Sequence, residues 1–343
     1  MLLILLLMEK CYAGKFSDYY NKQPSSVIEN LNIKHVGPEF HIIASSFIGM
    51  VGGAIHFYTL TSLEVMIDEV LCCNCSSVEA VAIFFLCPYS AVVVLRVCGS
   101  GCYSESGGKY QFAYLETAQS KINLFDLSTI TQCAPSSKPT RDEAITFNNG
   151  KQNITYSNFS YNYCQNSASV VLRSQNTLNS ESRFCTIIKN TVSTNSIINK
   201  DTIGTCIFSM CNIIDNTSPS YVIVFKSGGS FFDSILQGNS YQLFSSITGT
   251  ITINRGWIKH PLPLGIQYSF ISVVNTVEET KTYNILHLST QQCYVILENT
   301  FQHHPSPTEC YFGNTDSLEK ALPGLDRYKE MLIVPIFQAI ICF

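Results

Sequence analysis

The sequences CTIIKN, at Cys185–Asn190, and CNIIDN, at Cys211–Asn216, are two copies of the six-residue motif that decides how this chain folds. Each copy has a small residue first, an apolar residue third and an asparagine last. Two further copies are SNFSYN, at Ser157–Asn162, and SILQGN, at Ser234–Asn239. The closing asparagines are 28, 26 and 23 positions apart, so the motif marks one fixed point in a long repeat.

Weaker copies of the motif continue the same spacing toward the N-terminus. With these copies included, the motif closes eight times, and the mean step is 27 residues. A small residue and an apolar run follow several closing positions, as in GGAI at Gly52–Ile55. Each repeat therefore holds at least two short strands separated by a polar turn. The eight closing positions are Met50, Asn74, Ser100, Cys133, Asn162, Asn190, Asn216 and Asn239.

The length of the repeat predicts the architecture. At ~3.3 Å per residue, such a repeat makes one closed turn of three short strands, and stacked turns sit ~4.8 Å apart. A leucine-rich repeat needs recurring leucine, a helical repeat needs a 3.6-residue period, and a β-sandwich does not require one register over eight units. We therefore predict an all-β fold, a right-handed parallel β-helix of about eight or nine rungs. Phe159, Ile187, Ile213 and Leu236 should stack in one interior column.

Two further columns follow from the same register. Asparagine tolerates left-handed backbone and can bond along its own column, so the closing asparagines should form a structural ladder. Cys185 and Cys211 each lie five residues before a closing asparagine, at a position filled elsewhere by serine. Their Cα atoms should be ~4.8 Å apart, within the range of a disulfide, so we expect neighbouring sulfurs that are either stacked thiols or bonded. The ladder comprises Asn162, Asn190, Asn216 and Asn239.

The chain divides into five segments. Residues 1–13 look like a signal peptide, the alternative being a buried first strand. Residues 14–39 should cap the solenoid, with a helix starting at Ser25 or Ser26. The β-helix spans 40–260, degenerate strands 261–312 and a tail 313–343. The apolar end of the tail, Met331–Phe343, is too short to span a bilayer. It is either the start of a truncated membrane anchor, which would allow membrane association, or a buried strand.

Composition and sequons indicate the compartment and the partners. Charged residues make up 13% of the chain, the net charge is −4, and no run of Lys and Arg occurs, so nucleic acid is not expected as a partner. The 15 cysteines and four sequons favour an extracellular or cell-surface location. Asn153 and Asn158 should face solvent and accept glycan. Asn74 and Asn216 should occupy the ladder and resist modification.

Catalytic chemistry finds little support in the sequence. Glycoside hydrolysis needs two carboxyl groups roughly 5–10 Å apart. Asp68–Glu69 and Asp142–Glu143 are adjacent in sequence, and we expect solvated turn carboxylates there. Arg173 and Arg183, candidate lyase bases, have no acidic cluster in register. We therefore expect no catalytic residues.

Metal and cofactor sites are not expected either. The cysteine-rich segment Cys72–Cys75 lacks the paired CxxC units of structural zinc sites. Its cysteines, together with Cys87, Cys98 and Cys102, should be disulfides or core thiols. The pair His303–His304 lies in a Pro-flanked segment that we interpret as a solvated loop.

GGAI at Gly52–Ile55 and FSYN at Phe159–Asn162 carry a resemblance. The pairing of GGA[ILV] with FxxN resembles the repeat of the polymorphic membrane proteins of chlamydiae. It is also similar to large sets of surface β-helix proteins in trichomonad-type protists. The resemblance covers roughly residues 40–239. It implies a pectin-lyase-like right-handed β-helix at a cell surface with roles in adhesion, and it supplies no catalytic residues.

The function that these observations favour is contact rather than catalysis. We expect a secreted or cell-surface β-helix protein that binds glycans or proteins of a host or a neighbouring cell. The alternative is a carbohydrate-active enzyme, a polysaccharide lyase or hydrolase, since such enzymes use this fold. Fold analogy alone is a weak basis for an activity.

Overall fold

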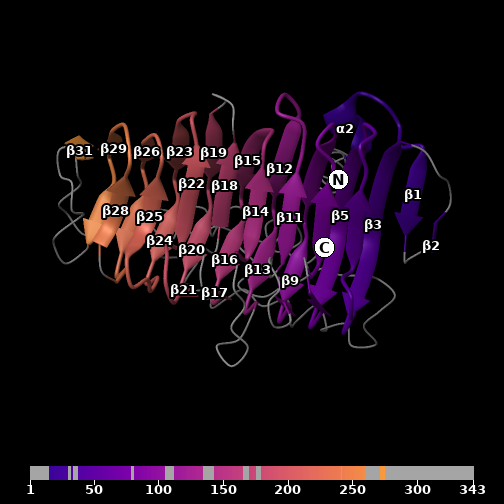
Figure 1. Ribbon diagram of the computed structural model, residues 1–343, viewed down its shortest axis with the longest axis horizontal. Helices are drawn as coiled ribbons and strands as arrows, with labels where there is room; N and C mark the ends of the chain where they lie inside the picture. The colour runs from indigo at the N-terminus through magenta and orange to yellow at the C-terminus, as the bar shows by residue number, and fades with distance from the viewer. Residues whose placement is uncertain are drawn as a thin grey trace, which may run out of the picture.

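A computed structural model gives the fold and describes residues 15–29, 32–33, 38–78, 81–104, 112–133, 143–164, 170–174, 179–240, 242–259 and 271–274. Short parallel strands stack along one long axis into a solenoid (Figure 1). Within these residues the one α-helix is α2 (Phe16–Tyr20), so the all-β prediction is confirmed.

The strands lie on three faces. Face 1 holds the N-terminal parts of the long strands β3 (Glu39–Ile48) and β5 (Glu64–Cys73), whose C-terminal parts begin face 2. Face 1 continues with β8 (Ala91–Leu95), β12 (Ile122–Asp126), β15 (Lys151–Thr155), β19 (Ser180–Arg183), β23 (Cys206–Ser209), β26 (Gly229–Phe232), β29 (Ile251–Asn254) and β31 (Ile271–Val274). Face 2 continues with β9 (Cys98–Ser100), β13 (Thr129–Thr131), β16 (Asn158–Ser160), β20 (Thr186–Ile188), β24 (Asn212–Ile214), β27 (Ile235–Gln237) and β30 (Trp257–Lys259).

Face 3 is a separate parallel sheet. Eight successive turns of the described chain each supply one strand to it. Its strands are β4 (Ile55–Tyr58), β7 (Ile83–Leu86), β11 (Ala113–Glu116), β14 (Ile145–Asn148), β18 (Val170–Ser174), β22 (Ile198–Thr202), β25 (Tyr221–Phe225) and β28 (Gln242–Ser246). Two small pairs lie between faces 2 and 3: β6 (Ser76–Ser77) with β10 (Tyr103–Ser104), and β17 (Tyr163–Cys164) with β21 (Thr191–Val192).

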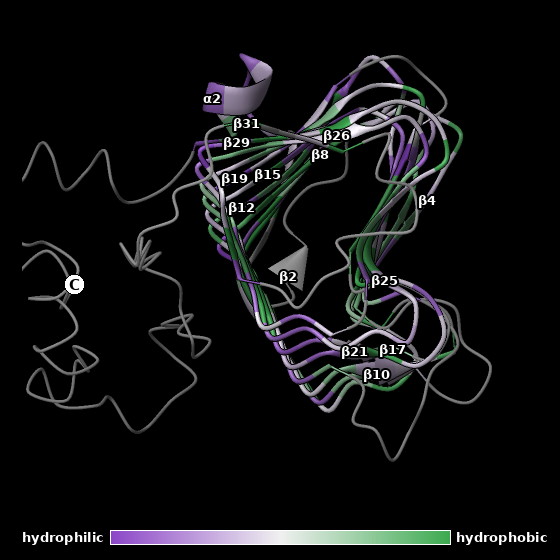
Figure 2. Cartoon of the chain, turned by 90° about the vertical axis from the view of Figure 1, so that its left-hand side faces the viewer, coloured by the Kyte–Doolittle hydropathy of each residue, from purple (hydrophilic) through white to green (hydrophobic). Residues whose placement is uncertain are grey.

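The winding is right-handed. Figure 2 views the solenoid from the end that carries β31, with faces 1 and 2 on the left and face 3 on the right. The chain runs down the left side, crosses the bottom and climbs the right side while it advances toward the viewer. Anticlockwise travel toward the viewer defines a right-handed helix, as connections between parallel strands prefer.

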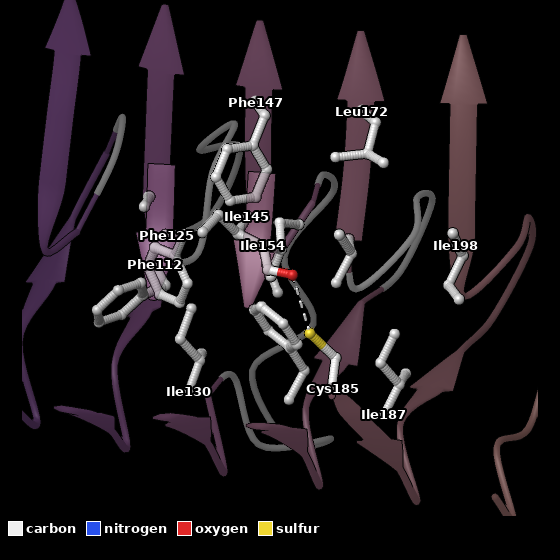
Figure 3. Packing of buried hydrophobic residues seen from close by; sticks show 14 of the residues in the cluster. Phe112, Phe125, Ile130, Ile145, Phe147, Ile154, Leu172, Cys185, Ile187 and Ile198 are labelled. Atoms are coloured by element: carbon white, nitrogen blue, oxygen red, sulfur yellow. Dashed lines mark hydrogen bonds between the residues drawn. The ribbon is translucent and has the colours of Figure 1, made fainter. Parts of the chain in front are cut away.

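The interior is filled by columns of apolar side chains. On face 2, Phe159, Ile187, Ile213 and Leu236 are paired in consecutive strands, and each is at most 2% exposed, so the prediction of one interior column is confirmed. Side chains from the three faces meet inside the ring, among them Phe125, Ile130 and Phe147 (Figure 3). The centroids of the Phe125 and Phe147 rings are 5.9 Å apart, in edge-to-face contact.

The N-terminal segment differs from the prediction. Ser26–Glu29 is a strand, β1, and not the start of a helix. It pairs with β3 and with β2 (Asn32–Ile33), because main-chain pairing satisfies the edge of the first rung better than an isolated helix would. The helix α2 lies outside the ring against face 1 (Figure 2). Its buried Phe16 packs on an outer apolar cluster that includes Met66, Val93 and Leu95.

Several predicted segments lie outside the described residues. They are the signal peptide 1–13, the tail 313–343 and the segment 261–312 apart from β31. The histidines at 303 and 304 lie there too.

Replacing Ile187 with Asp should lower the free energy of unfolding by several kcal/mol, because an unpaired charge would be buried in the core. Ile188, the next residue on β20, is only half-buried and faces outward, so Ile188→Asp is the matched control and should change little. Urea unfolding followed by circular dichroism measures both. Equal losses at the two positions would contradict the assigned register.

Candidate functional site

The rungs of the described chain bend at two corners where the backbone is left-handed. The first corner lies between faces 1 and 2, and its nine residues all have φ between 45° and 53°. They are Ala44, Glu69, Arg96, Leu127, Tyr156, Phe184, Met210, Asp233 and Arg255. The second corner follows face 2 and holds Gly49, Asn74, Gly101, Gln132, Tyr161, Lys189, Asp215 and Gly238.

The two corners differ in the residues they use. Left-handed backbone costs roughly 1–2 kcal/mol for an ordinary residue, and Gly, Asn and Asp adopt it most readily. Five of the eight residues at the second corner are of these types. At the first corner Asp233 is the one such residue among nine. The first corner therefore keeps large side chains where the backbone favours small or polar ones.

These side chains form an outward row that we call the ridge, consisting of Glu69, Arg96, Leu127, Tyr156, Phe184, Met210, Asp233 and Arg255. They stand in consecutive rungs, since each backbone N–H from Arg96 onward bonds to the strand of the next rung. Leu127 is 51% exposed and Tyr156 49%, while Phe184 and Met210 are half-buried. At ~4.8 Å per rung, the eight residues span about 34 Å.

Contacts between rungs hold the ridge in place. The rings of Tyr156 and Phe184 stack with centroids 4.8 Å apart and planes 7° from parallel. The Arg183 guanidinium lies 5.3 Å from the centroid of the Phe184 ring. Such stacked and cation–π contacts order large side chains that would otherwise rotate freely. The centre of the ridge is therefore a preformed apolar surface.

An ion pair closes each end of the ridge. At one end Arg96 binds both oxygens of Asp68, and its Nη2 lies 3.3 Å from Glu69 Oε1. At the other end Arg255 donates two hydrogen bonds to Asp233, of 2.7 and 2.6 Å. Arg255 holds the pKa of Asp233 below its usual range. The apolar centre is thus bounded by fixed charges of both signs.

The sequence reasoning missed the ridge, although the sequence carries its signal. Each ridge residue from Glu69 to Asp233 lies six positions before the residue that follows the second corner, as Tyr156 precedes Asn162 and Phe184 precedes Asn190. The predicted motif used only the small, apolar and asparagine positions, so it gave no prediction for this outward position.

The asparagine ladder lies directly after the second corner. Asn190 donates from its backbone N–H to Asn216 Oδ1 at 3.0 Å. Its side-chain amide donates to the Phe159 carbonyl oxygen at 2.7 Å and to Asn216 Oδ1 at 3.1 Å. Asn162 and Asn216 repeat these bonds, and the Asn239 amide donates to the Ile213 carbonyl. The left-handed residue is the one before each asparagine, and not the asparagine itself as expected.

Three cysteines continue this ladder toward the N-terminus. Cys75 and Cys102 donate from Sγ to the carbonyl oxygens of Phe47 and Cys72, at 3.3 and 3.4 Å. The Cys133 backbone N–H donates to Asn162 Oδ1 at 3.0 Å, and this bond connects the cysteine part of the ladder to the asparagine part. The closing positions predicted at residues 74 and 100 are therefore wrong, and the ladder passes through Cys75 and Cys102. Degenerate copies of the motif could not fix the register to one residue.

Cys185 and Cys211 follow the first corner and face inward. Their strands pair in register, so they occupy consecutive rungs. Each Sγ donates to a carbonyl oxygen of the preceding rung at 3.3 Å, Cys185 to Ile154 (Figure 3) and Cys211 to Ser182. Both are thiols. Burial, and then the neighbouring Cys185, raise the pKa of the Cys211 thiol.

Three of the four sequons, Asn74, Asn153 and Asn158, are placed differently from the prediction, and Asn216 lies in the ladder as predicted. Asn158 is 2% exposed and cannot present its amide to solvent, although its register position points outward. Asn153 lies within strand β15 and not in a turn, and it is half-buried. Asn216 is fully buried in the ladder. Asn74 is exposed at the left-handed second corner, one residue before the ladder.

Asp68 and Glu143, two of the carboxylates considered for catalysis, are buried and not solvated, which corrects that prediction for both. Asp68 is fully buried against Arg96, and burial raises its pKa to about 6 although Arg96 opposes the shift. Glu143 is 3% exposed and lies 2.5 Å from Arg173 Nη2. Asp68 belongs to face 1 and Glu143 precedes the face 3 strand β14, so they do not form the close pair of a glycosidase. Asp142 lies outside the described residues.

A buried lysine was not anticipated. Lys200 stands in an interior column of face 3 between Leu172 and Phe225 and is fully buried. Its Nζ donates to the carbonyl oxygens of Gly204 and Gly228. Desolvation lowers its pKa. These bonds bind the turn that leads from face 3 back to face 1, which is a structural role.

Two searches within the described residues bear on other classes of site. No group of three or more His, Cys, Asp or Glu side chains there could hold a metal ion. No helix in the same part of the chain is long and apolar enough to cross a membrane. Comparison with protein-family models, curated proteins and solved structures gives no match to this chain.

The ladder can be tested at Asn190. Asn190→Ala removes the partners of the Asn162 amide and of the Phe159 carbonyl, so it should lower the free energy of unfolding by about 2–4 kcal/mol. Asn190→Cys should cost less, because a thiol at this register reaches the same carbonyl, as Cys102 does. Chemical unfolding of both variants gives the comparison. An Asn190→Cys variant as unstable as Asn190→Ala would contradict the thiol ladder.

Glycan addition provides a second test. When the chain is expressed in a eukaryotic secretory host, Asn74 should carry glycan, because it is exposed at a turn. Asn158 and Asn216 should remain unmodified, and Asn74→Gln should remove the modification. Peptide mass spectrometry measures the occupancy of each sequon. Glycan at Asn216 of the folded protein would contradict the burial of the ladder.

Proposed function

We propose that this chain is a secreted or cell-surface β-helix protein that acts by contact, and that the ridge is its binding surface. The observation that carries the proposal is the composition of the first corner. Leu127, Tyr156, Phe184 and Met210 stay in solvent contact at left-handed positions where Gly or Asn would fold more favourably. Strain of this kind is characteristic of functional positions.

The shape of the ridge supports recognition of a large partner. Its residues repeat at the rung spacing along a straight solenoid, so they meet an extended surface and not a small molecule. Tyr, Phe, Met and Arg are enriched in the cores of protein interfaces. The stacked pair Tyr156–Phe184 is already ordered, so little conformational entropy is lost when a partner binds.

The resemblance to chlamydial and protist surface β-helix proteins, with its pectin-lyase-like fold, supports the same class of function. It adds the expectation of a cell-surface location and a role in adhesion. The ligands that fit are proteins or glycans of a host or neighbouring cell. Polysaccharide cleavage is the competing activity, and it is tested with acidic polysaccharides alongside attachment.

The test removes the rings without weakening the fold. Tyr156→Gly with Phe184→Gly deletes the centre of the ridge at positions where glycine relieves the backbone, so stability should stay within about 1 kcal/mol. Beads coated with this variant should lose attachment to a printed glycan array and to cultured epithelial cells. Beads coated with the unmodified chain should attach to at least one of these surfaces or to a surface coated with the unmodified chain itself.

The second corner supplies the matched control. Tyr161 and Lys189 are also left-handed, lie in consecutive rungs and carry large side chains, and Tyr161 is 52% exposed. Tyr161→Gly with Lys189→Gly should therefore leave attachment unchanged. Equal attachment by all three forms would contradict the ridge as the binding surface. Cleavage of acidic polysaccharides by the unmodified chain would contradict a function by contact alone.

A further inference from the structure

The order of side chains along the ridge has a symmetry. Read from the N-terminal rung, the ridge is acidic, basic, apolar, aromatic, aromatic, apolar, acidic, basic. When the ridge of a second copy is laid against it in the opposite direction, every position meets a complementary one. Glu69 faces Arg255, Arg96 faces Asp233, Leu127 faces Met210, and Tyr156 faces Phe184.

This antiparallel arrangement is a two-fold one. Its axis crosses the ridge between the Tyr156 and Phe184 rungs, so each contact occurs twice, as in any isologous dimer. The even spacing of the rungs keeps all eight positions in step along about 34 Å. A parallel arrangement would instead place each charge against the same charge, at a cost in free energy. The charges therefore select one orientation.

We propose that the partner of the ridge is a second copy of this chain, bound antiparallel through the two ridges. This inference rests on the proposed function, since it names the occupant of the same surface. Homophilic pairing would let identical proteins on two surfaces join those surfaces, which an antiparallel arrangement permits.

The dimer is expected to be weak. A single row of side chains is narrow, so we expect its interface to fall below the roughly 1,200 Å² of standard complexes. Exposed ion pairs set orientation more than affinity and weaken as salt rises. Pairing should therefore depend on concentration and ionic strength, and many copies on one surface should strengthen it by avidity.

The test reverses one end of the ridge without removing its ion pair. Asp233→Arg with Arg255→Asp preserves a local pair and the net charge. In the antiparallel dimer it places like charges against Arg96 and Glu69 of the second copy. Sedimentation velocity over a range of concentrations should then show at least a tenfold loss of dimerisation. Tyr156→Gly with Phe184→Gly should lose dimerisation as well.

The control reverses an exposed ion pair elsewhere. Asp201 and Lys226 lie 2.8 Å apart near face 3 and are about as exposed as Arg255. Asp201→Lys with Lys226→Asp should dimerise like the unmodified chain. A chain that stays monomeric at every concentration, or a reversed ridge that dimerises normally, would overturn the inference.

The bead assay separates this inference from the proposed function. Attachment of beads that depends on Tyr156 and Phe184, in a chain that does not dimerise, would leave the contact function standing and remove the second copy as partner. Dimers without any attachment of beads to cells or glycans would remove the cell-contact role and leave the pairing of ridges.

Discussion

The register of the solenoid depends on hydrogen bonds that each rung makes to the next at its corners. After the second corner, the side-chain NH2 group of an asparagine donates to a backbone carbonyl oxygen of the preceding rung, as in Asn190 and Asn216. The side-chain oxygen of the asparagine accepts a hydrogen bond from a backbone N–H of that rung, as Asn216 accepts from Asn190. These groups are buried, and each lost partner would cost about 1–3 kcal/mol. Because the bonds bridge rungs, they keep equivalent residues in line. The interior columns and the outer ridge are both consequences of that alignment.

The ridge shows how a repeat scaffold places a row of large side chains on its outer surface. A left-handed residue leaves the plane of both adjoining strands, so its side chain stands out at the corner. At the second corner this position is filled mostly by Gly, Asn and Asp, the residues that adopt left-handed backbone most readily. At the first corner the position holds large side chains, for which left-handed backbone is less favourable. Stacking between neighbouring rungs orders these side chains, as with Tyr156 on Phe184. This contrast between the two corners within one molecule is the basis for the proposal that the first corner serves contact.

Much of the fold could be predicted from the sequence, because small and apolar residues that recur at a regular spacing indicate strands stacked in register. The interior column through Phe159 and Ile187 followed from the intact copies of the motif. Where the motif is degenerate, thiols replace asparagine at Cys75 and Cys102, and the predicted register slipped. Burial at outward positions could not be predicted either, because alternation gives the direction of a side chain and not what covers it. Asn158 is the example, since it faces outward and is 2% exposed.

Hydroxyl-radical footprinting of the chain, free and bound to the surface it attaches to, tests the central claim most directly. The account predicts that Tyr156 and Met210 are oxidised in the free protein and protected in the bound one, while interior Phe208 and Phe231 are protected in both. Tyr161, at the other corner, should stay reactive throughout. Protection of Tyr161 on binding, with Tyr156 still reactive, would contradict the account, because the contact would then lie at the wrong corner.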